Sequence, residues 1–238
     1  MMNGARFYIF VSILLFSTFS SYANSAGKVN PQVSQAAVAI PDKYAAKVAE
    51  DILLAGGNAV DAAIATGFAL AVTYIDAGNI GGGGFMLIYI DGKALFLDYR
   101  ETAPLTAHRD MYLNDEKAVI QNLSLIGAKA PGVPGTVAGF WEAHQRFGKL
   151  SWSKLLAPAI KLAEEGFIPA NILVDDIQDH YQRFDGLTNF KTYFGSVEHG
   201  KKLKQPELAA TLKRIAVNGR KEFYHGETAK LLVKQMQK

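Results

Sequence analysis

Arg100 follows an apolar segment and stands close to two acidic residues, Asp98 and Glu101. A guanidinium offers parallel N–H donors that match the two oxygens of a carboxylate, so arginine is well suited to bind the acidic end of a small molecule. Arginine is rarely buried without a partner. Two interpretations are therefore open: Arg100 binds a substrate carboxylate, or it forms an ion pair with Asp98 or Glu101.

Four consecutive glycines, Gly81–Gly84, precede another apolar segment. Glycine-rich loops can bind phosphates, but a dinucleotide-binding loop follows a strand and leads into a helix. Here the order is reversed, because a helix-like segment precedes the glycines and a strand-like segment follows them. A P-loop also requires Gly-Lys-Ser/Thr, whereas this chain continues with Phe85 and Met86. The pattern therefore disfavours nucleotide binding.

A β-hairpin would bring the glycine run and the arginine together. The dipeptide Asp91-Gly92 between two apolar segments is typical of a two-residue hairpin turn. Without a bulge, the register that this turn sets places Gly83 opposite Arg100. Side chains alternate along a strand, so Arg100, Asp98 and Phe96 share one face. The glycines would then leave the guanidinium open to a carboxylate; alternatively, they only allow a helix to pack closely.

Two helices are predicted before the glycine run. Apolar residues at helical spacing indicate the first within 41–57, ended by Gly56-Gly57. Asn58 is suited to cap the second, 59–72, with Asp61 in its first turn. This second helix is apolar nearly all round and should be buried. Both strand-like segments are apolar on both faces, which predicts central strands covered on two sides.

The second half of the chain is predicted to be mostly helical. Three apolar stripes at helical spacing end at Gly148, Gly166 and Gly219. Pro158, inside the second stripe, predicts a kink or a restart of that helix. A last helical segment, 227–238, has no C-cap, which we interpret as the truncation of a longer protein.

Composition excludes several kinds of chemistry. The chain of 238 residues has no cysteine, so disulfides, thiolate catalysis and cysteine-based metal sites are excluded. Its five histidines show no paired spacing on a helix face, and we predict no metal site. A net charge of +3 is too small to indicate nucleic-acid binding. A hydrophobic content of 49% and a charged content of 20% are ordinary for a globular protein.

The N-terminus predicts an export signal. Arg6 precedes an apolar run, 7–16, and Ser21-Tyr22-Ala23 fits a small-x-small cleavage site. The run is shorter than the ~20 residues of a membrane span, which favours cleavage over an uncleaved anchor. We therefore predict a signal peptide at 1–23 and a flexible lead-in at 24–37. Export without cysteine indicates a periplasmic or secreted bacterial protein.

Several motifs in this order resemble the γ-glutamyltransferase (γ-glutamyl transpeptidase) family. The resemblance extends from about residue 36 to 238, and its order makes it more specific than the glycine run alone. The motifs read LLAGGNAVDAAIATGFALAV, IGGGGFMLIY, DYRETAP, PGVPGTVAGFWEAHQRFGKLSW and LAPAIKLAEEGF. The resemblance identifies 38–238 as part of the family's large subunit.

The resemblance implies a fold and an activity. The fold is α+β, the αββα sandwich of the N-terminal-nucleophile hydrolases, incomplete in this chain. A precursor cuts itself into two subunits, and the new N-terminal threonine of the small subunit attacks glutathione or another γ-glutamyl compound. Water or an acceptor amino acid or dipeptide resolves the γ-glutamyl-enzyme, with no metal or organic cofactor. Arg100 matches the family's arginine that holds the glutamyl α-carboxylate, and it is the predicted substrate-binding residue.

No catalytic residue is predicted within this chain, because the nucleophile belongs to the small subunit. Thr102 and Thr136 are interpreted as a motif residue and a helix-start residue. Alternatives are a related acylase or a poly-γ-glutamate-processing transferase on the same fold, or a non-catalytic γ-glutamyl or amino-acid-binding protein. Asn79, where the family often has glycine, and the segment 40–44 depart from the family pattern and leave substrate preference open. The chain alone is expected to be inactive and poorly stable.

Overall fold

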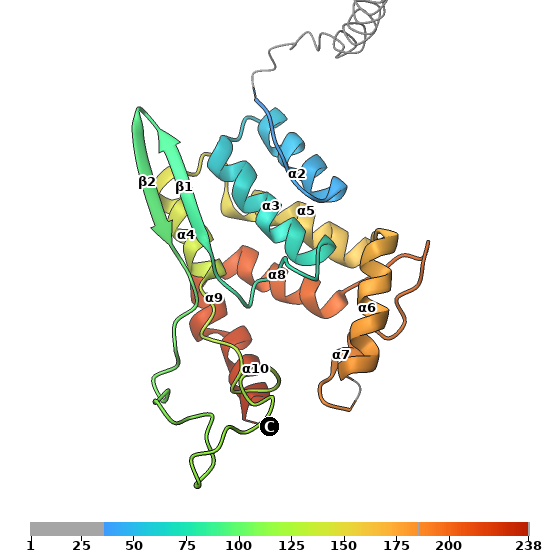
Figure 1. Ribbon diagram of the computed structural model, residues 1–238. Helices are drawn as coiled ribbons and strands as arrows, with labels where there is room; N and C mark the ends of the chain where they lie inside the picture. Colours follow the sequence, from blue (N-terminus) through green and yellow to red (C-terminus); the bar gives the residue numbers. More distant parts are fainter. Residues whose placement is uncertain (1–35, 185, 238) are drawn as a thin grey trace, which may run out of the picture. The chain divides into compact units, whose positions relative to one another are not determined.

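The computed structural model of the chain describes residues 36–184 and 186–237 (Figure 1). The predicted signal peptide, 1–23, and most of the predicted lead-in, 24–37, lie outside these residues. Val38–Lys238 forms one compact unit that mixes helices with a β-hairpin. This agrees with the predicted α+β class. None of the helices within the described ranges combines the length and the apolar character that crossing a membrane requires.

The two helices predicted before the glycine run are confirmed. Helix α2 (Lys43–Leu54) begins at Asp42, whose carboxylate accepts a hydrogen bond from the Ala45 N–H at 2.8 Å. Helix α3 (Ala59–Thr73) begins at Asn58 and buries residues around its whole circumference. Asn58 and Asp61 form a reciprocal capping box, in which each side chain accepts from the other's backbone N–H.

The Asp61 carboxylate also joins distant parts of the chain. It is fully buried, and it accepts hydrogen bonds from the backbone N–H of Lys149 at 3.0 Å and of Leu150 at 3.3 Å. These residues lie between the next two helices, so one side chain caps α3 and fixes the loop packed against it. The backbone N–H groups around this buried carboxylate satisfy its oxygens and so offset the cost of burying it.

We expect Asp61→Asn to lower the free energy of unfolding by about 2 kcal/mol, because an amide N–H₂ would face a backbone donor and leave it unsatisfied. Thermal or urea unfolding of the purified protein measures this loss. Asp51→Asn is the matched control: Asp51 is exposed and pairs with the exposed Lys47, so it should change stability by less than about 0.5 kcal/mol. Equal losses in the two variants would contradict the role assigned to Asp61.

Strands β1 (Phe85–Ile90) and β2 (Lys93–Asp98) form the predicted antiparallel hairpin. Its turn has φ of 50° at Asp91 and 73° at Gly92, the left-handed geometry of a type I′ turn. One face of the hairpin packs on the helical core through Ile88 and its neighbours. Strand pairing follows the predicted register along its whole length.

The prediction that both faces of the strands are covered is not met within the described residues. The outer face carries four large apolar side chains that expose between 52% and 77% of their surface: Phe85, Leu87, Tyr89 and Phe96. Two of them stack, with the Phe85 and Phe96 ring centroids 5.6 Å apart. The strands are therefore apolar on both faces, but the described residues cover only one of these faces.

The three apolar stripes of the second half form the helices α4 (Thr136–Phe147), α5 (Trp152–Glu165) and α8 (Pro206–Asn218), as predicted. Helix α5 packs between α3 and α8 in the core (Figure 1). It runs through Pro158 without a restart. The Trp152 indole N–H donates to the Ile215 carbonyl at 3.0 Å, which joins α5 to α8 inside the core.

Three further helices were not predicted individually: α6 (Asn171–Phe184), α7 (Phe190–Phe194) and α9 (Arg220–His225). The segment predicted as the last helix is α10 (Glu227–Met236). Between β2 and α4 the chain has no helix or strand, and isolated bridges pair Thr102 with Val133 and Leu113 with Val119.

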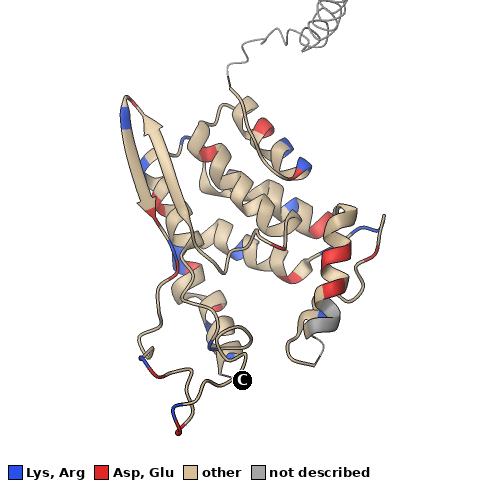
Figure 2. Cartoon of the chain, viewed as in Figure 1, with Lys and Arg blue, Asp and Glu red and all other residues tan. Residues whose placement is uncertain are grey.

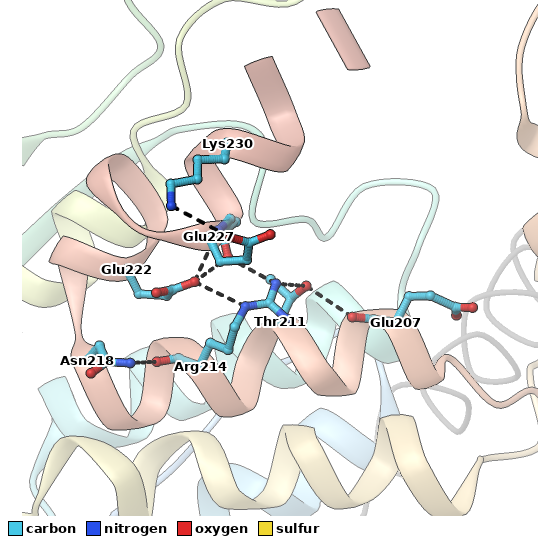
Figure 3. A network of polar contacts seen from close by, with 8 residues as sticks. Glu207, Thr211, Arg214, Asn218, Glu222, Glu227 and Lys230 are labelled. Atoms are coloured by element: carbon cyan, nitrogen blue, oxygen red, sulfur yellow. Dashed lines mark hydrogen bonds and ion pairs between the residues drawn. The ribbon is translucent and has the colours of Figure 1, made fainter. Parts of the chain in front are cut away.

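An ion pair between Arg214 of α8, which is partly exposed, and the buried Glu222 of α9 joins α8, α9 and α10 (Figure 3). The Arg214 Nε donates to the Glu222 carboxylate at 3.0 Å, and the Glu222 residue is only 7% exposed. The same carboxylate accepts from the backbone N–H of Thr228 at 3.1 Å and from its hydroxyl at 3.0 Å. Burial raises the pKa of Glu222, but the hydrogen bonds from Thr228 and Arg214 outweigh it and hold the pKa below its usual value.

The Glu222 carboxylate should make the stability of the folded protein sensitive to acid. The folded-state pKa of Glu222 lies below its unfolded value, so its stabilisation is present above about pH 4.5 and is lost as the pH falls through the folded pKa. Unfolding at pH 5, 4 and 3 should show a smaller loss of stability for Glu222→Gln than for the unaltered protein. Glu227→Gln, at an exposed pair 3.9 Å from Lys230, is the control and should leave the acid sensitivity unchanged.

Candidate functional site

The segment that carries Arg100 continues β2 between two other stretches of backbone. On one side Tyr99 and Gly84 exchange backbone hydrogen bonds at 3.0 and 3.4 Å. On the other side Thr102 and Val133 exchange hydrogen bonds at 2.8 and 3.2 Å. Backbone on both flanks therefore fixes the position of the Arg100 Cα.

The glycine run packs directly on this segment, as the hairpin register predicts. A Cβ added at Gly83 would lie 2.5 Å from the Tyr99 carbonyl oxygen and 2.8 Å from the Arg100 carbonyl carbon. No residue from 78 to 84 has a φ in the left-handed region. Glycine is needed at position 83 for the close approach of two backbones, not for an unusual backbone conformation.

The second interpretation of the glycines, close packing of a helix, also holds. The Gly82 carbonyl accepts hydrogen bonds from the backbone N–H of Gly135 at 2.7 Å and of Thr136 at 3.0 Å, at the start of α4. A Cβ at Gly135 would lie 1.8 Å from the Tyr99 carbonyl oxygen, and one at Gly139 would lie 2.2 Å from the Tyr99 Cγ. Glycines therefore line both sides of the segment.

The Arg100 side chain is exposed. Within the described ranges, no hydrogen bond or ion pair engages its guanidinium. The Asp98 carboxylate instead accepts from the Arg100 backbone N–H at 2.9 Å. The alternative prediction, an ion pair with Asp98 or Glu101, is therefore wrong for this structure. Figure 2 shows the middle of both strands free of charged residues.

This arrangement leaves a cation with unused donors on a rigid backbone. An exposed guanidinium can accept a carboxylate through two parallel hydrogen bonds. Because the flanking backbone is already ordered, binding would cost little conformational entropy beyond that of ordering the arginine side chain. The geometry suits recognition of a small acidic group.

Tyr99, Gly135 and Gly139 are the residues at this site that sequence reasoning missed. Two signals could have found them. Alternation along β2 places Tyr99 on the face opposite Arg100, toward the core. Gly135 and Gly139 lie four residues apart, so they occupy one face of α4 and mark it for close approach. Thr136 is the first residue of α4, as predicted, and Thr102 forms an isolated bridge with Val133.

Comparisons with known proteins agree on one family. Residues 45–238 match the family profile described as Gamma-glutamyltranspeptidase. The chain is 63% identical over 201 residues to the glutathione hydrolase proenzyme of Pseudomonas aeruginosa, covering 84% of this chain but 36% of that protein. It therefore spans about a third of the length of this curated relative.

Solved structures give the same result. The γ-glutamyltranspeptidase of Pseudomonas nitroreducens, complexed with L-DON, matches with a TM-score of 0.83 and 63% identity, over 85% of this chain and 60% of that chain. The transpeptidase CapD of Bacillus anthracis matches with a TM-score of 0.71 and 33% identity, over 86% of this chain and 65% of that chain. On the family profile and on these identities, the chain belongs to the γ-glutamyltranspeptidase family.

Proposed function

We propose that the chain is the N-terminal, large-subunit part of an exported enzyme that transfers γ-glutamyl groups and hydrolyses glutathione. Membership of the family supports this, and so does the identity of 63% to a protein named glutathione hydrolase proenzyme. The word proenzyme in that name also supports processing of a longer precursor into two subunits.

Arg100 is the substrate-binding residue in this proposal. Its guanidinium has no partner among the described residues, and it follows a hairpin whose register places it against the glycine run. This single observation carries the proposal, because an unpaired cation on an ordered backbone is what binding a glutamyl α-carboxylate requires.

The reaction itself would be completed by residues beyond this chain. A threonine at the start of the small subunit attacks the γ-carbonyl, and its own α-amine accepts the hydroxyl proton. The γ-glutamyl group becomes bound to the threonine oxygen, and the amine of the leaving peptide takes up a proton. Water, or an amino-acid or dipeptide acceptor, then releases the γ-glutamyl group from the threonine oxygen. We assign the exposed outer face of the hairpin to the inner layer of an αββα sandwich completed by the rest of the protein.

The test is expression of the full-length coding sequence with and without the part after Lys238. The full-length protein should yield two subunits and release glutamate from glutathione, whereas the chain 1–238 should do neither. A full-length product that stays uncleaved and inactive would contradict the proposal. N-terminal sequencing of periplasmic or secreted material tests the proposed signal peptide, which predicts a start after Ala23.

A second candidate is a related transferase on the same fold that processes poly-γ-glutamate. The match to CapD, named a transpeptidase, supports group transfer as the reaction, although its identity and TM-score are lower than those of the γ-glutamyltranspeptidase match. A polymer terminus carries the same α-carboxylate that Arg100 would bind. Comparing kcat/KM for glutathione with that for poly-γ-glutamate separates the two functions. We expect glutathione to be the better substrate.

A further inference from the structure

The ring of Tyr99 lies in a slot that glycines line. A Cβ at Gly139 would lie 2.2 Å from the ring's Cγ, and one at Gly84 would lie 3.1 Å from its Cε2. No other side chain could occupy these two glycine positions without moving the ring. The Phe140 ring closes the slot and makes an edge contact with the Tyr99 ring, with the two ring centroids 5.7 Å apart.

The slot holds Tyr99 through contacts with its ring rather than through its hydroxyl. The Tyr99 hydroxyl donates to the Phe85 carbonyl at 3.5 Å, the long limit of a hydrogen bond, so this contact contributes little. Ring packing, in contrast, involves a half-buried aromatic surface held on several sides. Burial accordingly raises the pKa of Tyr99. Phenylalanine would fill the same slot.

The orientation of Arg100 follows from this packing. Consecutive residues of an extended segment point to opposite faces, so a Tyr99 ring fixed toward α4 directs the Arg100 side chain away from the core. If the ring left the slot, only the backbone hydrogen bonds would hold the segment, and the direction of the Arg100 Cα–Cβ bond would be less well defined. The exposure of Arg100 and the partial burial of Tyr99 agree with this opposition.

We infer that Tyr99 is a positioning residue for Arg100. The Tyr99 ring is held between Gly84, directly before β1, and Gly139 of α4, and it thereby directs the guanidinium toward the substrate carboxylate. The inference rests on the proposed function, because it assumes that Arg100 binds this carboxylate. Tyr99 itself touches no substrate in this account.

A double-mutant cycle in the full-length protein tests it, with Tyr99→Leu, Tyr99→Phe, Arg100→Ala and the combination of Tyr99→Leu with Arg100→Ala. Tyr99→Leu should raise KM for a γ-glutamyl donor about tenfold, with kcat within about twofold, because only binding through Arg100 weakens. Tyr99→Phe should retain the normal KM. In the Arg100→Ala background, Tyr99→Leu should raise KM by less than about twofold further, because it has nothing left to position.

Two controls separate positioning from stability. Phe223→Leu removes a buried aromatic ring on α9 and should lower the unfolding temperature without changing KM. Gly139→Ala displaces the Tyr99 ring without removing it and provides a second variant if Tyr99→Leu does not yield folded, processed enzyme. It should raise KM in the same direction.

The outcomes distinguish the inference from the function on which it rests. A Tyr99→Leu effect of equal size with and without Arg100, or a fall in kcat at unchanged KM, would overturn the inference and leave the proposed function intact. If Arg100→Ala itself left KM unchanged, the substrate role of Arg100 would be wrong and the inference would fall with it.

Discussion

Arg100→Ala in the full-length protein should raise KM for γ-glutamyl substrates about 100-fold, because two charge-assisted hydrogen bonds to the α-carboxylate, worth about 3 kcal/mol together, are lost. The guanidinium has no partner among the described residues, so its removal leaves no buried acid unpaired. Folding and self-cleavage should therefore stay intact. Steady-state kinetics and the appearance of two subunits on a denaturing gel measure both.

Two variants control this prediction. Arg100→Lys keeps the charge but loses the planar fork, so its KM should lie between those of the unaltered enzyme and Arg100→Ala. Arg109→Ala removes another exposed arginine, which pairs with Asp110, and should leave KM unchanged. An unchanged KM in Arg100→Ala would remove this residue from the site.

The hairpin could be predicted in detail because its determinants are local. Asp91-Gly92 supplies the two positive φ angles that a type I′ turn needs, and the turn then sets every pair of the ladder. The register extends to the glycine run for the same reason. The caps at Asn58 and Asp61 were predictable on similar grounds, because capping depends on residues three apart in the sequence.

What escaped prediction depends on contacts between distant residues. Helix α9 has six residues, too few to be stable alone, and is held by the pair of Arg214 with Glu222 and by the Tyr224 hydroxyl, which donates to the Pro134 carbonyl at 2.8 Å. Contacts of this kind cannot be read from a short window of sequence. Helix α6 is different: its buried Leu173, Val174 and Ile177 form a local apolar stripe beside an acidic face, a pattern that the sequence does contain.

The site itself was predictable only in part. Sequence spacing placed Arg100 opposite the glycines, but the reason for the glycines lies in two backbones approaching within contact distance, which spacing alone does not show. From the sequence alone, pairing of Arg100 with Asp98 is equally open. The structure decides against it, because the Asp98 carboxylate is engaged by the Arg100 backbone N–H.

Gly83→Ala and Gly81→Ala should differ sharply, although the two glycines are two residues apart. Neither has a φ in the left-handed region, so the comparison isolates steric effects. A Cβ at Gly83 would lie 2.5 Å from the Tyr99 carbonyl oxygen and 2.7 Å from the Glu101 nitrogen, and backbone atoms cannot yield as a flexible side chain does. A Cβ at Gly81 would find its nearest neighbour, the Asn79 Oδ1, at 4.0 Å.

Gly83→Ala should therefore force the Arg100 segment away from the glycine run, lower stability by about 3 kcal/mol and raise KM for γ-glutamyl substrates more than about tenfold. Gly81→Ala should keep both quantities close to normal. Unfolding and steady-state kinetics of the two full-length variants, measured side by side, provide the test. If Gly83→Ala were as well tolerated as Gly81→Ala, the close approach of the two backbones could not be what holds the Arg100 segment in place.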